Sequence, residues 1–148
     1  MVSKKIDYNE MTNKALLKVV RDILEIIAEK GVYKKQHLCI TFATNHLDVE
    51  MSEFLREEFE EEMIIILQYE FWDLIVDEHG FYVSLSFEHG EETLYVPFAS
   101  IVSVMDPSEG FCLELTPSFE NVKKKEIPEV TAQKSNVIFL DMFKKEKQ

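Results

Sequence analysis

The sequence predicts an α+β domain in which one N-terminal helix packs on a small antiparallel β-sandwich or open barrel. Three observations support this fold class. Apolar residues recur at spacings of three and four in residues 9–30, and from His37 onward the apolar period becomes two. Turn sequences that contain glycine separate the later segments, as in an antiparallel meander. A chain of 148 residues is long enough for one such domain and a tail.

The predicted helix spans residues 9–30. Asn9 or Thr12 can cap its start, and Gly31 follows its end, where a left-handed backbone conformation is common. Its apolar stripe is broad, so one side can cover the domain's own sheet while the other side meets a second helix. We therefore hypothesise a homodimer built on this helix, through Leu16, Val19, Val20, Ile23 and Ile27.

The predicted strands follow in order. Residues 37–44 alternate, and the acidic residues 52–62 predict a short helix or an irregular loop. Residues 63–69 are continuously apolar, which predicts a strand buried on both faces. Further strands are predicted at residues 71–76, 81–87, 93–96, 100–105 and 111–115, with turns at 77–80, 88–91 and 106–110.

The character of the chain changes after Pro117. Residues 1–117 form the predicted body, and residues 118–136 are charged, polar and without periodicity, which predicts a disordered linker. Residues 137–148 carry an apolar cluster followed by lysines. Two interpretations stay open: a short linear motif that docks on another protein, or a C-terminal strand that packs back on the body. The motif would consist of Val137, Ile138, Phe139, Leu140, Phe143, Lys144 and Lys145.

The formal charge of −12 is spread unevenly. Residues 48–120 hold 19 acidic side chains and one basic side chain, Arg56, whereas residues 121–148 hold seven lysines and four acids. An acidic body repels phosphate backbones, so nucleic acid is a poor candidate partner. The N-terminus does not resemble a signal peptide, and no apolar run is long enough to span a membrane. We therefore expect a cytoplasmic protein in which Cys39 and Cys112 are buried, reduced thiols.

The chemistry of an enzyme is not evident in the sequence. The four histidines lack partners at metal-ligand spacing, and no glycine-rich loop could cradle phosphate. We therefore expect no catalytic residue, no metal and no cofactor. A small enzyme remains a competing interpretation, which a convergent polar pocket with a perturbed His or Cys would support. A peptide groove is the favoured alternative, because the Gln68 amide can pair with a peptide backbone and lies close to Phe71 and Trp72.

Several segments resemble the stringent starvation protein B family in its alphaproteobacterial branch. They are MIIILQYEFWDLI at residues 63–75, then FYVSLSF, TLYVPF and SVMDPSEGF, and the tail segment VIFLDMFKK. With the N-terminal helix, the resemblance covers nearly the whole chain. It is weaker toward the gammaproteobacterial form, from which the body and the tail ending differ.

The resemblance implies a proteolytic adaptor. Members of this family bind ssrA-tagged polypeptides and tether them to the ClpXP protease, without catalysis of their own. The implied body is a dimeric, Sm-like fold with a tag groove, and the implied tail binds the N-terminal domain of the ClpX unfoldase. The tail motif falls on residues 137–145, and the groove is expected to draw on Gln68, Phe71, Trp72, Ser84, Leu85, Ser86, Phe87, Val102, Val104 and Met105.

Overall fold

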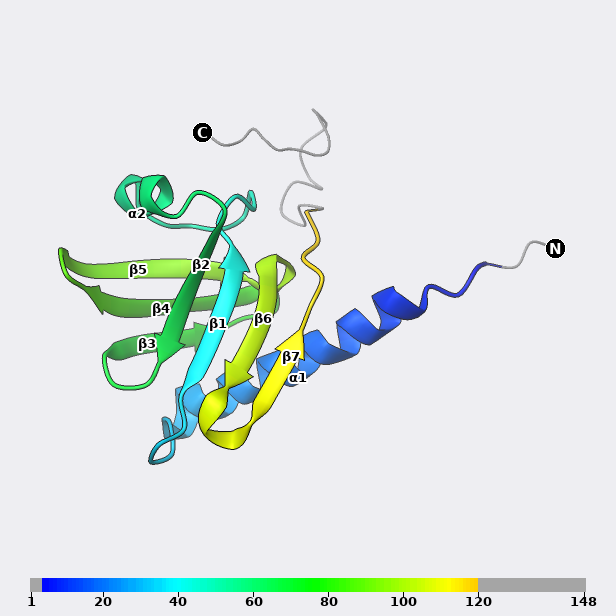
Figure 1. The fold of residues 1–148 in the computed structure, drawn as a ribbon, viewed down its shortest axis with the longest axis horizontal. Helices are drawn as coiled ribbons and strands as arrows, with labels where there is room; N and C mark the ends of the chain where they lie inside the picture. The colour runs from blue at the N-terminus through cyan, green and yellow to red at the C-terminus, as the bar shows by residue number, and fades with distance from the viewer. Residues whose placement is uncertain (1–3, 120–148) are drawn as a thin grey trace.

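The computed structural model describes residues 4–119, whose seven strands form two antiparallel sheets (Figure 1). The four-stranded sheet has the order β2-β1-β6-β7, and the three-stranded sheet is the meander β3-β4-β5. The strands are β1 (Leu38–Ala43), β2 (Glu62–Leu67), β3 (Phe71–Val76), β4 (Gly80–Phe87), β5 (Gly90–Pro97), β6 (Ile101–Asp106) and β7 (Phe111–Glu114). Short 3₁₀ turns, Phe98–Ser100 and Pro107–Glu109, flank β6. The predicted α+β fold class is confirmed.

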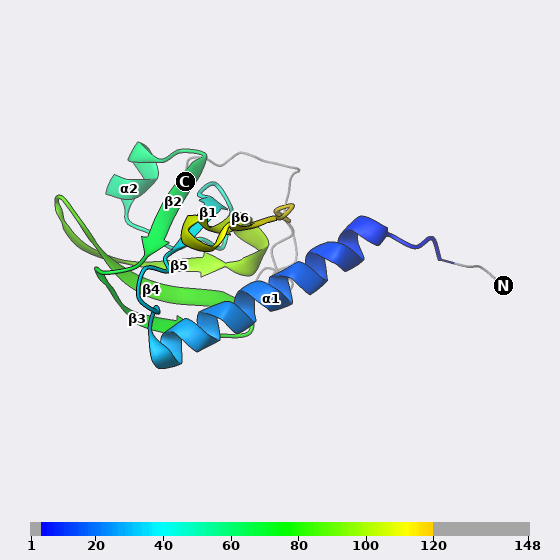
Figure 2. The same ribbon diagram turned by 60° about the horizontal axis from the view of Figure 1, so that its bottom comes forward.

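The long helix α1 (Tyr8–Lys30) runs along the side on which the two sheets are open (Figure 2). The helix begins one residue earlier than predicted, and its N-cap is Asp7 rather than Asn9 or Thr12. The Asp7 carboxylate accepts a hydrogen bond from the Glu10 amide at 3.1 Å. Gly31 follows the helix with a φ of 80°, which only glycine adopts freely. Figure 2 shows the first turns of α1 extending past the sheets.

The core lies between the two sheets and under the inner side of α1. Val20 and Leu24 of the helix are completely buried there. The strands contribute alternate residues, as the period of two predicts. The largest fully buried side chains from the strands are Ile40, Phe42, Leu67, Phe81, Leu94 and Ile101.

Strand β2 departs from its predicted burial. Its alternation is regular, with Met63, Ile65 and Leu67 buried. Ile64 and Ile66 point outward and are 60% and 50% exposed. The prediction of a strand buried on both faces is wrong for the described chain, because β2 is an edge strand whose outer face no described element covers.

The acidic segment before β2 contains a short helix, α2 (Glu53–Glu58), as one of the two predicted alternatives. Ser52 caps it by accepting from the Leu55 amide at 3.2 Å, and the Leu55 side chain is buried. Arg56 donates to the carbonyl oxygens of Thr44 and Val49, both at 2.8 Å. One guanidinium therefore ties α2 to the loop that follows β1.

The two thiols lie in different environments. Cys39 is buried in β1, where burial and then the nearby Asp106 carboxylate raise the pKa of its thiol. Cys112 is exposed, so the prediction that both cysteines are buried is wrong for Cys112. The reason is its register: Cys112 pairs with Met105 at an outward position of β7, the edge strand opposite β2.

After β7 the chain remains attached to the body up to Phe119. The Thr116 amide donates to Asn13 Oδ1 of α1 at 2.9 Å, and the Ser118 amide donates to the Ala99 carbonyl at 2.7 Å. His46 Nε2 donates to the Ser118 carbonyl at 2.8 Å, and the His46 ring lies 5.5 Å from that of Phe119. Packing thus continues two residues past the predicted boundary at Pro117. The rest of the predicted linker and the segment 137–148 lie outside the described residues.

His46 is neutral in this arrangement. Its Nδ1 accepts from the Asp48 amide at 3.0 Å, so the ring proton is on Nε2, which faces the Ser118 carbonyl. Burial lowers the pKa of His46 to about 4, although the hydrogen bond to Ser118 acts in the opposite direction. A positive charge on this ring would break the contact with the Asp48 amide.

Stability should therefore depend on pH through His46. An unfolded histidine takes up its proton near pH 6.5, whereas the folded ring stays neutral down to about pH 4. As the pH falls through this window, the unfolded state binds more protons, and the chain loses about 3 kcal/mol of stability from this group. This loss is measured by urea unfolding of the wild type and of His46→Asn at a series of pH values from 7.5 to 4. The asparagine side chain can still accept from the Asp48 amide but does not titrate, so a stability difference that stays constant with pH would contradict the assignment.

Candidate peptide-binding surface

The register of the three-stranded sheet decides which predicted groove residues share a face. Trp72 pairs with Ser84, and Ser84 pairs with Thr93, so these three side chains lie on the outer face, together with Ser86. Phe71 pairs with Leu85 on the inner face. Phe71, Leu85 and Phe87 pack in or against the core, so they cannot line an open groove on the outer face.

The predicted groove residues of β6 lie on the other sheet. Val104 is completely buried in the core, and Met105 is on the outer face of the four-stranded sheet, beside Cys39. Val102 is half-buried at the irregularity in the β1–β6 pairing. Because β1 lies between β6 and β2, the fold does not bring these residues to Gln68.

Gln68 lies where the two sheets meet. It directly follows β2, in the three-residue turn that leads to β3, and its side chain is half-buried. The next residue, Tyr69, is the most exposed large hydrophobic side chain among residues 4–119, at 79%. The amide of Gln68 is thus held at the edge of an open surface that also offers an aromatic side chain.

Three outer-face residues that the sequence did not single out complete this surface. Ile75 pairs with Tyr82, and Tyr82 pairs with Tyr95, whose ring lies 4.6 Å from that of Tyr82. Alternation from Ser84 and Ser86 could have identified Tyr82. It could not have identified Ile75, because Asp73 and Leu74 together oppose a single residue of β4. This β-bulge, in which Asp73 has a φ of 55°, turns Ile75 outward.

We call the side chains of Trp72, Ile75, Tyr82, Ser84, Ser86, Thr93 and Tyr95, with Gln68 at one edge, the aromatic face. Ser84 and Tyr95 are buried within it, at 6% and 2% exposure. Its polar groups are held by neighbours. The hydroxyls of Ser84 and Thr93 are 2.8 Å apart, and Tyr95 Oη donates to Asp77 Oδ1 at 3.1 Å. Burial, and then the Asp77 carboxylate, raise the pKa of Tyr95, so its hydroxyl remains a donor.

The chemistry of the aromatic face suits an extended peptide. The exposed Ile75 and Tyr82 side chains provide apolar contact, while the Ser86 and Thr93 hydroxyls and the Gln68 amide provide donors and acceptors for a peptide backbone. Such binding depends on contact area and hydrogen bonds rather than on opposite charge.

Catalytic or metal chemistry has little support in the described part of the chain. Residues 4–119 contain no group of three or more His, Cys, Asp or Glu side chains that could hold a metal ion. The closest arrangement to a catalytic cluster is Ser52, His89 and Glu92. There the Ser52 hydroxyl (2.9 Å) and His89 Nε2 (2.7 Å) both contact the Glu92 carboxylate. Because Ser52 and His89 bond to the acid rather than to each other, they do not form a nucleophile–base pair.

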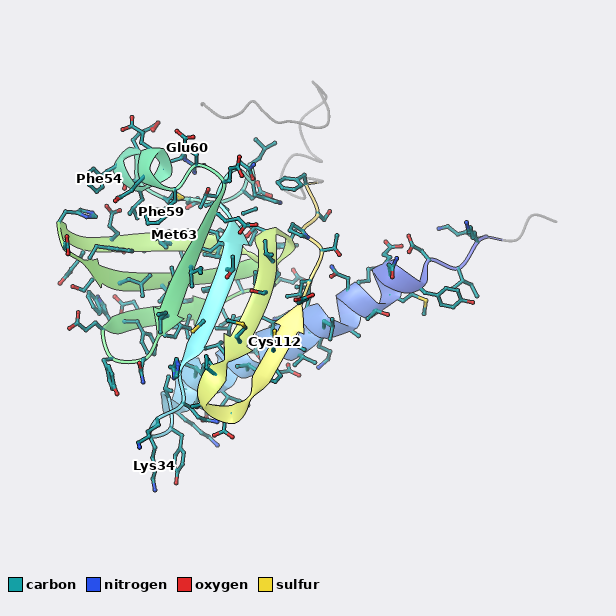
Figure 3. The ribbon with its side chains drawn as sticks, viewed as in Figure 1. Lys34, Phe54, Phe59, Glu60, Met63 and Cys112 are labelled. Atoms are coloured by element: carbon teal, nitrogen blue, oxygen red, sulfur yellow. The ribbon has the colours of Figure 1, made fainter. Side chains whose placement is uncertain are left out.

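The predicted dimer residues of α1 do not all face outward. Val20 is in the core, and Leu16, Ile23 and Ile27 pack against it. Val19 is 40% exposed and continues an outward stripe with Met11 and Ile26. Beyond Ile26 the stripe reaches an open cleft of about 620 Å³ beside Tyr33 and Phe111. Lys34, which Figure 3 labels on the loop after α1, also lines this cleft.

The molecule is thus a helix-and-double-sheet domain whose distinctive features are open apolar and aromatic surfaces. The family model for stringent starvation protein B matches residues 10–148, and the chain belongs to this family. No curated protein matches the chain. None of the helices in residues 4–119 is long and apolar enough to cross a membrane. The Sm-like likeness and the alphaproteobacterial branch stay predictions.

The hydrogen bond from Tyr95 to Asp77 should contribute measurably to the stability of the fold. Tyr95→Phe keeps the ring but removes the donor to Asp77, and it should lower the free energy of unfolding by about 1 kcal/mol. Tyr82→Phe is the matched control, because its ring is on the same face and its residue is 37% exposed. We expect the control to change stability by less than about 0.5 kcal/mol. Urea denaturation at pH 7.5 compares the two, and equal losses would show that the Tyr95 hydroxyl is not a special support.

Proposed function

We propose that this chain is a proteolytic adaptor that binds ssrA-tagged polypeptides and tethers them to the ClpXP protease. The observation that carries the proposal is the family match, which extends beyond the body into the C-terminal segment. An adaptor needs two binding elements and no catalysis, and the aromatic face supplies a suitable surface for the first.

The tag is proposed to bind on the aromatic face, next to Gln68. Trp72, Ser84 and Ser86 are the predicted groove residues that share this face, and Tyr82 and Ile75 enlarge it. An extended tag would place alternate side chains against the aromatic rings and pair its backbone with the Gln68 amide. The body is acidic, so apolar contact and backbone hydrogen bonds supply the affinity.

The C-terminal residues 137–145 are proposed to dock on the N-terminal domain of the ClpX unfoldase. Two weak contacts, one to the tag and one to the unfoldase, then act together through effective concentration, which can raise overall affinity by about 10²- to 10⁴-fold. A homodimer would contribute two such segments. We propose that it forms through the outward stripe Met11, Val19 and Ile26 and the adjoining cleft, in the cytoplasm.

Two alternatives predict different behaviour. A peptide-binding domain without a protease link would bind the tag but would not accelerate degradation. An Sm-like nucleic-acid binder would bind RNA through basic surface side chains, yet residues 36–119 contain Arg56 as their single base against 18 acids. No observation favours either alternative over the adaptor.

Loss of the Gln68 amide should weaken tag binding. Gln68→Ala removes the proposed hydrogen bonds to the tag backbone, and we expect the Kd of a fluorescent tag peptide to rise about 5- to 10-fold. Gln36→Ala, in the loop before β1, is the matched control and should bind like the wild type. Fluorescence anisotropy gives both affinities. An unchanged Kd for Gln68→Ala would remove this residue from the proposed site.

Removal of the C-terminal segment should separate binding from delivery. A chain that ends at Asn136 lacks the proposed docking motif and should bind the tag peptide with unchanged Kd. It should not accelerate the degradation of a tagged reporter by ClpXP, because the second contact is missing. Degradation rates with the full chain and with the shortened chain measure this. If the shortened chain delivers the reporter equally well, the proposed role of residues 137–145 is wrong.

A further inference from the structure

The outer face of the four-stranded sheet carries an apolar row that crosses all four strands. Ile66 pairs with Cys39, Cys39 pairs with Met105, and Met105 pairs with Cys112, so the four side chains lie side by side. Ile64 lies two residues from Ile66 on the same face. We call these five residues the apolar row. Figure 3 marks Cys112 on β7, at one end of the row.

The apolar row is open in the described part of the chain except at Cys39, which is buried. Ile64, Ile66 and Cys112 are exposed, and Met105 is half-buried. An edge strand of a soluble protein usually carries charged or polar residues at outward positions, which oppose unwanted pairing. Strand β2 carries two isoleucines there, in a run that is apolar on both faces. A contiguous patch of this kind marks an interaction surface.

We propose that the apolar row is a docking site for the chain's own residues 137–143. Six of these seven residues are apolar, and Lys144, Lys145 and Lys147 follow directly. Two exposed acids, Glu62 on β2 and Glu114 on β7, flank the row on the two edge strands. Apolar contact with the row and attraction between these acids and the lysines both favour this occupant.

The connection between the two partners is long enough. The hydrogen bond between His46 and Ser118 holds the chain near the Ala43 end of β1. The apolar row crosses β1 at Cys39, four residues away, which is about 13 Å along the strand. The 17 residues from 120 to 136 span about 60 Å when extended, and a random chain of that length has a mean span of about 20–25 Å.

A connection of this length favours binding within one molecule. Its effective concentration is on the order of millimolar, which exceeds the concentration of most partners in solution. Even a weak contact between residues 137–143 and the row would therefore be occupied for much of the time.

Docking within the chain goes beyond the proposed function and bears on its regulation. The segment proposed to bind ClpX would be the same segment that covers the apolar row, so an adaptor without an unfoldase would shield its own motif. This consequence rests on the proposed function, but the docking itself does not, and it can be tested without ClpX or a tag.

The reactivity of Cys112 measures occupancy of the row. The full chain is labelled with a maleimide at pH 7.5 and at low micromolar concentration, and is compared with the full-length double variant Phe139→Asp, Phe143→Asp. We expect Cys112 to react at least fivefold more slowly in the wild type. Cys39, which belongs to the row but is buried between its neighbours, is the internal control and should react slowly in both chains.

A matched pair of variants tests the surface. Ile66→Asp places a charge in the row and should raise Cys112 reactivity to that of the double variant, whereas Ile75→Asp, on the aromatic face, should leave it protected. The wild-type comparison needs no substitution in the body, so a folding defect in Ile66→Asp leaves the main test intact. Equal Cys112 rates in the wild type and the double variant would overturn the proposal. The proposal would also be overturned if Cys112 of the double variant reacted more slowly as the protein concentration increased, because a second copy of the chain would then be covering the row.

Discussion

Val20 and Leu24 of α1 are completely buried in the core that the two sheets share, and the position of the helix decides which surfaces of the described chain remain open. Sheets of three and four strands are too small to enclose a core alone, and the helix closes the side that they leave open. Once α1 is in place, three apolar surfaces remain outside: the outer stripe of the helix, the aromatic face and the apolar row. Each proposed partner occupies one of these surfaces. A second copy binds the outer stripe of the helix, a peptide binds the aromatic face, and the C-terminal residues of the chain bind the apolar row.

Much of this fold could be predicted from local patterns. The helix and all seven strands are close to their predicted positions, because the periods of 3.6 and 2 follow from side-chain direction. Local patterns gave wrong predictions where the burial of a side chain depended on its neighbours in space. The residues around Ile64 and Ile66 have the composition of a buried strand, yet β2 is at a sheet edge. Cys112 has apolar neighbours in the sequence, which is typical of a buried thiol. Its exposure depends instead on the order of the strands, because β7 is at the edge of its sheet.

The candidate site shows the same division. Gln68, Trp72, Ser84 and Ser86 lie around one face because a three-residue turn and a hairpin join their strands, and short connections are visible in the sequence. Met105 was grouped with them, but β1 separates its strand from β2. Ile75 was not predicted as an outer-face residue because a β-bulge at Asp73 shifts the alternation by one residue. The sequence contains no glycine or proline there that would indicate a bulge.

Arg56 has a consequence for the electric field of the molecule. It is the single base in residues 36–119, and its guanidinium is engaged by the carbonyl oxygens of Thr44 and Val49. Residues 36–119 therefore carry 18 acids with almost no opposing surface charge, whereas residues 4–35 carry eight bases and five acids. Residues 4–119 thus form an electric dipole whose positive end is the helix and the loop after it. Two copies therefore repel each other more strongly sheet to sheet than helix to helix.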